Sequence, residues 1–347
     1  MSIVSVHTEW DALEEVVIGT LTAGRTPTGD RSLLAVEFAD LPAPEDVPSG
    51  PFPADIVAET NDELNEVCAE LTSLGIKVRR PQERDTAATF ATPDWHADGF
   101  YDYCPRDVLL TVGDTVIETP MVLRSRFLEP FAYRSMLIEF LRSGSRWLSA
   151  PKPQLLDELY DLQAPAGRRL RDLEPAFDAA NVLKFGTDIL YLVSDTGNEL
   201  GALWLQSVLG KRYTVHPCRG IYASSHVDST IVPLRPGLVL LNPERVNDEN
   251  MPELLQGWDH LWCPELAEIG YHGGRPRCSN WIGMNLLVIR PNLVMADDRQ
   301  PALIRALEAH GVDVVPKRLT HARSLGGGFH CVSLDVRRAG PLESYRR

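Results

Sequence analysis

The sequence predicts a propeller-like α/β fold, in which one small unit is repeated around a central axis. Two observations predict it. Four segments share one pattern, namely two short β-rich runs joined by a turn pair, with a polar residue just before the first run. Amphipathic helical stretches lie between or beside these segments, and further short β-rich runs follow them. A recurring unit of strand, strand, helix and strand is typical of folds that close radially.

Each of the four segments is predicted to be a β-hairpin, because β-branched and other apolar residues flank a turn that contains Gly or Pro. The hairpins are expected at residues 107–118, 181–193, 228–241 and 285–296. Helical periodicity predicts helices at residues 59–74, 134–142, 198–209 and 301–310. The β-rich runs 75–79 and 311–315 then supply the last strand of two units.

A fifth unit is predicted from two distant parts of the chain. The runs 13–19 and 329–336 could pair with each other, and that pairing would close a ring. The pattern leaves open an ordinary α/β sheet with hairpin insertions. Two stretches lie outside the repeat, and we expect both to be surface loops rather than domain linkers: residues 41–53 and 150–174.

Composition limits the classes of protein to which the chain can belong. Its 347 residues, 44% of them hydrophobic, suffice for one large domain or two ordinary ones. The formal net charge of -14 argues against a nucleic-acid partner, and no apolar run is long enough to span a bilayer. The first residues do not resemble a signal or transit peptide. Six widely spaced cysteines predict neither a zinc cluster nor a disulfide scaffold, so we expect a cytoplasmic protein without a metal.

One cysteine stands out because it follows a glycine run. In Ser324-Leu325-Gly326-Gly327-Gly328-Phe329-His330-Cys331, the glycines allow positive φ and close approach of other groups to the backbone. Cys331 is therefore a candidate nucleophile. The alternative is a buried structural cysteine, because free cysteines are often buried.

The polar residues at the starts of the hairpins should gather around the axis if the units form a ring. They comprise a thiol, a histidine, carboxylates and amides: Asp107, Asp178 with Asn181, His226 with Asp228, Met284 with Asn285, and Cys331. Such a set suits nucleophilic and acid-base chemistry. The alternative is that the carboxylates cap turns and that the His226 and Asp228 pair is a satisfied polar pair.

His226, rather than His330, is the predicted proton-transfer residue. His226 and Asp228 are two apart in a predicted strand, so their side chains should share a face, whereas His330 adjoins Cys331 and should point away from it. Carboxylates around a thiol would raise its pKa and repel anionic substrates. A cationic, planar guanidinium reverses that penalty and is matched bidentately by carboxylates, so the cluster favours a substrate such as arginine.

Eight motifs over almost the whole chain resemble those of the amidinotransferases and, within them, the inosamine-phosphate amidinotransferases of streptomycin-type aminocyclitol antibiotic biosynthesis. The motifs are EWDALEEV at 9–16, CPRD at 104–107, RSRF at 124–127, APKP at 150–153, FDAA at 177–180, HVDST at 226–230, NPER at 242–245 and LGGGFHC at 325–331. The resemblance implies one catalytic domain over residues 1–347. It also implies a five-bladed α/β propeller of ββαβ modules with pseudo-five-fold symmetry, the pentein-like fold.

The resemblance further implies a ping-pong transfer of the amidino group from L-arginine to an amine, without a cofactor, in a chain that could form a homodimer. Cys331 matches the nucleophile that forms an amidino-cysteine intermediate, and His226 and Asp178 complete the catalytic set. Asp107 and Asp228 match positions that bind the guanidino group. Arg245 matches the position that holds the carboxylate of the donor.

The acceptor is expected to be an aminocyclitol phosphate rather than glycine. Relatives in the resembled family that use glycine have an Asn-Pro-Met run before the catalytic histidine and a serine before the second-to-last hairpin. This chain has Ala223-Ser224-Ser225 and Gly283 there, so the resemblance implies a roomier mouth for the site. Arg124 and Arg126 could bind the phosphate through their charge, but structural pairing with carboxylates is the stronger expectation. Two other functions remain open at this point, a hydrolase of arginine with the same fold and a catalytically inactive module that binds guanidino compounds.

Overall fold

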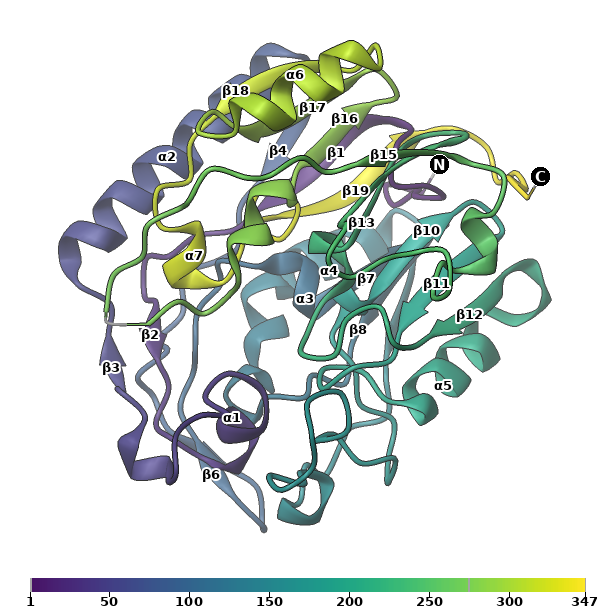
Figure 1. Cartoon of the computed structure of the whole chain (residues 1–347). Helices are drawn as coiled ribbons and strands as arrows, with labels where there is room; N and C mark the ends of the chain where they lie inside the picture. Colours follow the sequence, from purple (N-terminus) through teal and green to yellow (C-terminus); the bar gives the residue numbers. More distant parts are fainter. Residues whose placement is uncertain (1, 274, 347) are drawn as a thin grey trace.

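Five three-stranded sheets repeat around the molecule in the computed structural model, which describes residues 2–273 and 275–346 (Figure 1). In each sheet the middle strand pairs antiparallel with one neighbour and parallel with the other. The fold is therefore the predicted five-bladed α/β propeller. The alternative of one ordinary α/β sheet is wrong, because the described strands form separate small sheets.

The strands of the five blades have the following bounds. The first blade contains β19 (Ser333–Ala339), β1 (Ala12–Ile18) and β4 (Lys77–Arg79); the second, β7 (Leu109–Val112), β8 (Thr115–Glu118) and β9 (Arg146–Ser149); the third, β10 (Val182–Phe185), β11 (Asp188–Leu192) and β12 (Thr214–Cys218); the fourth, β13 (Ile231–Arg235), β14 (Leu238–Leu241) and β15 (Asp259–Trp262); the fifth, β16 (Leu287–Arg290), β17 (Leu293–Asp297) and β18 (Asp313–Lys317).

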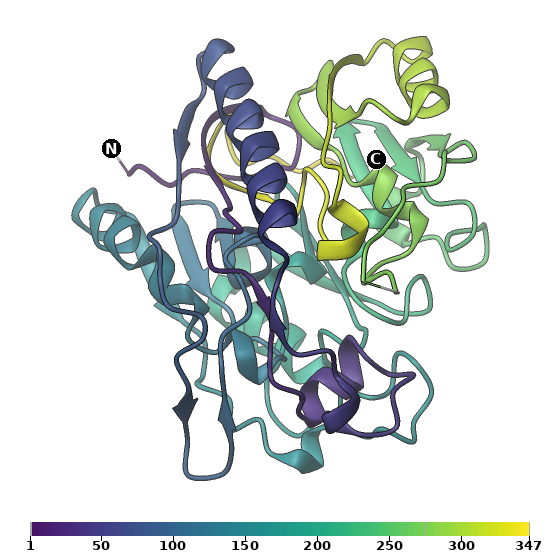
Figure 2. The same cartoon turned by 90° about the vertical axis from the view of Figure 1, so that its left-hand side faces the viewer.

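Four of the blades carry a helix between their middle and last strands, as the helical periodicity predicted. These helices are α2 (Ala54–Ser73), α4 (Arg134–Arg142), α5 (Glu199–Leu209) and α6 (Pro301–Ala309). Each buries one apolar stripe; in α2 this stripe is Ile56, Thr60, Leu64, Val67 and Leu71. Figure 2 shows α2, α4 and α6 spread around the periphery, so the apolar stripes face inward and the hairpins lie nearer the centre.

The fourth blade lacks such a helix in the described residues. A single 3₁₀ turn, η8 (Glu253–Leu255), stands between β14 and β15 instead. The intervening sequence Asn-Pro-Glu-Arg and the second proline at 252 explain the difference, because proline cannot continue a helix from its interior.

The first blade closes the ring with strands from the two ends of the described chain. β1 pairs antiparallel with β19, with Val17 opposite Leu334, and pairs parallel with β4. This confirms the predicted pairing of the runs 13–19 and 329–336. Trp10, which is fully buried, reinforces the closure by packing its ring edge-on against Phe185, Trp258 and Tyr345 at centroid distances of 5.8, 5.5 and 4.9 Å.

The polar residues before the hairpins lie in short helical turns rather than in the strands. Pro105 opens a one-turn helix, α3 (Pro105–Val108), which contains Asp107, and Asp228 lies in the 3₁₀ turn η7 (Val227–Ser229). Residues 329–332 form a turn before β19. The prediction that His226 and Asp228 share one face of a strand is therefore wrong, although both residues reach the same cluster.

The two stretches predicted to lie outside the repeat do so. Residues 41–53 contain η1 (Pro44–Asp46) and the short strand β3 (Gly50–Pro51), which pairs with β2 (Arg25–Thr26), and residues 150–174 contain η4 (Asp157–Leu159). Two strands of two residues, β5 (Phe90–Ala91) and β6 (His96–Ala97), and the helices α1 (Arg31–Val36) and α7 (Ala322–Leu325) complete the elements that border the site. Within the described residues, no helix combines the length and apolarity that crossing a membrane requires.

Candidate active site

The turns that precede the blades bring the predicted site residues together. The turn α3 packs against η5 (Ala179–Asn181), η5 packs against η7, and η7 packs against η9 (Asn280–Met284). Each turn delivers one polar side chain to the centre of the ring. Asp107, Asp178, Asp228 and Asn285 reach it from these four blades, and Cys331 reaches it from the turn before β19.

The glycine run lets the chain reach Cys331 through a space in which larger residues would not fit at positions 327 and 328. Gly326 has φ of +80° and ends α7 in the left-handed conformation. A Cβ on Gly327 would lie 2.6 Å from the sulfur of Cys104, and a Cβ on Gly328 would lie 2.8 Å from Oδ1 of Asn285. The same Oδ1 accepts hydrogen bonds from the backbone N–H groups of His330 (3.0 Å) and Cys331 (3.2 Å), which fixes the turn that carries the thiol.

The thiol of Cys331 is buried and protonated in the unliganded chain. Its Sγ–H donates to Oδ2 of Asp228 at 3.3 Å, and only 2% of the residue is exposed. Contact with the Cys104 side chain, burial and the charge of Asp228 all raise the pKa of Cys331 well above its ordinary value. A cation placed beside the sulfur would oppose these effects, so the arrangement favours ionisation of the thiol only when a cationic group is bound.

His226 lies between two carboxylates. Its Nε2 is 3.0 Å from Oδ2 of Asp178, and its Nδ1 is 3.6 Å from Oδ1 of Asp107. The backbone N–H of Val122 donates to the other oxygen of Asp178 at 3.2 Å and holds that carboxylate in place. Burial alone would lower the pKa of His226, but the charges of Asp107 and Asp178 raise it to about 9. His226 is therefore an imidazolium at neutral pH and can donate a proton.

Asp107 presents one carboxylate oxygen that has no hydrogen-bond donor. Its Oδ2 accepts from Nη1 of Arg126 at 2.6 Å, whereas its Oδ1 is buried and accepts no hydrogen bond, with Nδ1 of His226 3.6 Å away. Arg126 is held in turn by Glu129 through two hydrogen bonds of 2.7 Å. Burial raises the pKa of Asp107. Because a buried acceptor without a partner costs about 1–3 kcal/mol, Asp107 Oδ1 is an acceptor that a ligand with N–H donors would satisfy.

Asp228 is held by a second histidine. Nδ1 of His330 lies 2.9 Å from Oδ2 of Asp228, and Nε2 of His330 lies 3.3 Å from Oε2 of Glu9. The sequence predicted that His330 points away from Cys331 and so lies outside the cluster. This prediction is wrong, because both side chains contact the same oxygen of Asp228. Burial would raise the pKa of Asp228, but the hydrogen bond and charge of His330 lower it to about 2.

A buried network of charges supports this second histidine, and the sequence reasoning missed it. Glu9 lies 2.8 Å from Nζ of Lys184 and 3.5 Å from Nη1 of Arg106, and Arg106 bonds Asp335 at 2.9 Å. The available signal was Lys184, which stands between Leu183 and Phe185 in an apolar run. A lysine between apolar neighbours in a fully buried strand must find a buried partner.

A cavity of about 320 Å³ opens onto part of this cluster. Asp107, Asp178 and His226 line it together with Tyr222, Ser224, Ser225 and a group of arginines. Cys331 and Asp228 are buried and do not line the cavity of the unliganded chain. Ser225 lines the cavity, but Gly283 does not and packs against the side chains of Gln300 and Leu266 instead.

Arg245 lies beside the cavity rather than in it. Its Nη1 donates to Oγ of Ser229 (3.0 Å) and Oγ1 of Thr230 (2.9 Å), and its Nη2 donates to Oγ of Ser279 (2.9 Å). Its guanidinium lies over the ring of Tyr222, 3.6 Å from the centroid. Tyr222 and Ser279 line the cavity, so they separate Arg245 from the other site residues.

Arg124 and Arg126 are both paired with carboxylates, which was the stronger of the two expectations for them. Arg126 is paired with Asp107 and Glu129, and Arg124 donates to the carbonyl of Leu155 and to Asp157. Both are buried. In the described part of the chain, no three His, Cys, Asp or Glu side chains are arranged to hold a metal ion.

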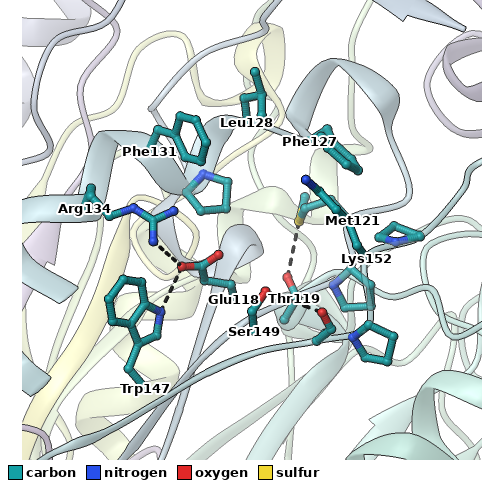
Figure 3. A pocket seen from close by; sticks show the side chains of 15 residues that line it. Glu118, Thr119, Met121, Phe127, Leu128, Phe131, Arg134, Trp147, Ser149 and Lys152 are labelled. Atoms are coloured by element: carbon teal, nitrogen blue, oxygen red, sulfur yellow. Dashed lines mark hydrogen bonds and ion pairs between the residues drawn. The ribbon is translucent and has the colours of Figure 1, made fainter. Parts of the chain in front are cut away.

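A second cavity, of about 420 Å³, lies at the ends of β8 and β9 and contains none of these residues (Figure 3). Aromatic and proline side chains form its walls, and its carboxylate, Glu118, is already engaged by Nε1–H of Trp147 at 2.8 Å and by Arg134 at 3.4 Å. Its other titratable side chain, Lys152, lies over the ring of Phe127 at 5.0 Å from the centroid, and no cysteine or histidine lines this cavity, so the predicted site residues belong with the smaller cavity.

Comparison with known proteins identifies the family of the chain. No protein-family model matches it. Inosamine-phosphate amidinotransferase 1 of Streptomyces griseus is 65% identical to it over 347 residues, which cover 100% of both chains. The L-arginine:L-lysine amidinotransferase of Pseudomonas savastanoi pv. phaseolicola is 36% identical over 352 residues, which cover 98% of this chain and 95% of that protein. A solved structure of the inosamine-phosphate amidinotransferase from Streptomyces griseus superimposes with a TM-score of 0.99 at 64% identity and 100% coverage of both chains. The chain therefore belongs to the amidinotransferase family.

Proposed function

We propose that the chain transfers the amidino group of L-arginine to an inosamine phosphate in two half-reactions, through an amidino-cysteine at Cys331. One observation carries the proposal. Asp107 offers a buried, unpartnered carboxylate oxygen next to the imidazolium of His226, in the cluster that also holds the thiol. The name of the relative that is 65% identical supplies the acceptor class.

In the first half-reaction, Asp107 and Asp228 hold the guanidinium of arginine while Cys331 attacks it. The bound cation lowers the pKa of the thiol, which releases its proton to solvent and forms an S–C bond to the guanidinium carbon. His226 donates its proton to the nitrogen of the departing ornithine, and the C–N bond breaks. Asp178 keeps the imidazole oriented through its 3.0 Å contact. The products are ornithine, a neutral His226 and an amidino-cysteine.

In the second half-reaction, neutral His226 takes a proton from the ammonium group of the acceptor. The free amine attacks the amidino carbon, the S–C bond breaks, and the thiolate leaves and recovers a proton. The acceptor becomes a guanidino compound. Removal of water from the bound carbon is essential here, since water would hydrolyse the amidino-cysteine to urea instead of allowing transfer.

We assign Arg245 to the carboxylate of arginine. The three hydroxyl groups that now accept from it, on Ser229, Thr230 and Ser279, can rotate and donate to a carboxylate that binds the same guanidinium. Tyr222 covers the guanidinium face, so this assignment requires the tyrosine ring to shift when arginine enters.

Intact-protein mass spectrometry tests the proposal. Incubation with arginine alone should add one amidino group per chain and release at most one equivalent of ornithine. Addition of hydroxylamine, a small amine, should remove the adduct as hydroxyguanidine, and a phosphorylated inosamine should be a far better acceptor than glycine. Steady formation of citrulline without any amine would instead establish a hydrolase, and an adduct on another cysteine would remove Cys331 from its role.

A further inference from the structure

The catalytic cavity is lined by charges of both signs. Besides Asp107, Asp178, His226 and the Arg126 that pairs with Asp107, three further arginines line it: Arg275, Arg277 and Arg323. The acidic side chain among these arginines is Glu37. A cavity with this polarity suits an acceptor that carries its amine at one end and an anionic group at the other.

Arg277 is the arginine whose binding capacity is least used. Its side chain is only 8% exposed, and its Nη2 donates to Oγ1 of Thr26 at 2.9 Å. Its Nη1 is buried and makes no hydrogen bond; the nearest carboxylate oxygen, Oε2 of Glu37, is 3.5 Å away. A buried charged donor that makes no hydrogen bond is costly, so Nη1 of Arg277 favours an anion that approaches more closely than Glu37 does.

Aromatic rings hold this guanidinium in position. Its carbon lies 4.6 Å from the ring centroid of Phe100, 5.4 Å from that of Phe38 and 5.7 Å from that of Phe52. These contacts restrict the side chain before any ligand arrives, so little entropy is lost on binding. They also exclude water, which strengthens a charge-assisted hydrogen bond.

The two neighbouring arginines are tied to carboxylates that lie outside the cavity. Arg275 bonds Asp40 at 2.5 Å, and Arg323 lies 3.6 Å from Glu268; the side chains of Asp40 and Glu268 are 67% and 81% exposed. Exposed ion pairs of this kind are weak and are screened by salt, so both arginines keep most of their attraction for an anion in the cavity.

We propose that Arg277, with Arg275 beside it, binds the phosphate of a phosphorylated amine acceptor and so selects that acceptor over unphosphorylated amines. The inference rests on the proposed function, because the acceptor must enter the same cavity. A phosphate monoester offers three oxygens and up to two negative charges, and it can displace Glu37 from the vicinity of Nη1. The carboxylate of arginine is the other anion that enters the cavity, and the test below separates the two.

Steady-state kinetics of Arg277→Gln should show a KM for the phosphorylated inosamine raised by about 10- to 100-fold, the range expected for loss of a charge-assisted contact. In the same variant, kcat/KM for hydroxylamine and the KM for arginine should each change at least about tenfold less than the KM for the phosphorylated inosamine does. Glu37→Gln should act in the opposite direction and lower the KM for the phosphorylated acceptor, since it removes the competing carboxylate. Arg290→Gln, an exposed arginine on β16, serves as the matched control and should leave all three parameters unchanged.

Inorganic phosphate provides a second measurement that does not depend on a variant folding. In the wild-type protein, inorganic phosphate should inhibit competitively against the phosphorylated acceptor and leave the hydroxylamine reaction unaffected. Two results for Arg277→Gln would overturn the inference while leaving amidino transfer intact. One is an equal loss of kcat/KM for phosphorylated and unphosphorylated acceptors, and the other is a raised KM for arginine alone. If the wild-type protein forms no hydroxyguanidine from arginine and hydroxylamine, the proposed function itself is wrong.

Discussion

The molecule contains two histidines that each face carboxylates, and they differ in what surrounds them. His226 lines the cavity between Asp178 and Asp107, one oxygen of which is unpartnered. His330 lies deeper, between Asp228 and Glu9, and Glu9 is neutralised by Lys184 and Arg106. The first pair is left incomplete for a ligand, and the second is completed by the protein. The two pairs differ in access and in unfilled hydrogen-bond capacity rather than in residue type, and the proposed division into a catalytic pair and a positioning pair rests on this difference.

Cys331 stands between the two pairs, and its removal should have the largest effect. We expect Cys331→Ser to reduce turnover by at least about 10⁴-fold, because a serine hydroxyl in this acidic cluster cannot ionise. Arginine binding should remain measurable by calorimetry. Cys218→Ser, on β12 away from the cluster, is the matched control and should keep full activity. Turnover by Cys331→Ser near that of the wild type would show that the thiol is not the nucleophile.

The two histidines should separate clearly by substitution. His226→Asn should lower kcat by about 10²- to 10⁴-fold, because it removes a proton donor at the cavity. His330→Asn should act chiefly on stability and on the KM for arginine, because it leaves Glu9 and Asp228 buried without their shared partner. Kinetics and chemical denaturation of both variants test this contrast. If His330→Asn lost kcat alone, the deeper pair would be the catalytic one.

Asp228→Asn should weaken arginine binding through the loss of charge. Removal of one partner from a buried charged contact typically costs about 3 to 5 kcal/mol, so the affinity should fall by a factor on the order of 10² to 10³. Calorimetric titration with arginine measures this. Asp298→Asn, which alters an exposed ion pair with Arg318, is the control and should bind arginine normally. An unchanged affinity in Asp228→Asn would exclude Asp228 from the guanidinium site.

The smallest predicted effect concerns the pKa of His226. Asp107 raises that pKa toward about 9, so Asp107→Asn should lower it, and the imidazolium should lose its proton at a lower pH than in the wild type. An NMR titration of the His226 ring reports the change directly. A His226 pKa that stays at its wild-type value would mean that Asp178 alone sustains it.

The fold was predictable because repetition and hairpin chemistry are local signals. The turn pairs at 113–114 and 236–237 and the helical periodicity at 134–142 lie within single units. The short turns that carry Asp107 and Asp228 were not predicted, because one turn of helix has no periodicity to detect. The fourth blade shows that repetition can also mislead, since in its described residues the unit keeps its strands while a 3₁₀ turn replaces the helix.

The membership of the cluster was predictable, but the partners within it were not. The position of Cys331 after the glycines and the placement of carboxylates before hairpins depend on sequence order. The contact of His330 with Asp228 and the seclusion of Arg245 behind Tyr222 depend on side-chain packing between units far apart in the chain. Arg277 carries no motif at all, and only its aromatic surroundings and its unpartnered nitrogen distinguish it from the other arginines.

The pairing that closes the ring also sets the order in which the enzyme can become active during its synthesis. Val17 of β1 finds its antiparallel partner, Leu334 of β19, only after about 300 further residues have left the ribosome, and the nucleophile lies just before that partner strand. Until then β1 keeps one unpaired edge, which chaperones or neighbouring chains could contact. The last blade to form is thus the one that brings in Cys331, so under the proposed function no amidino-cysteine can form on a nascent chain before β19 has been made.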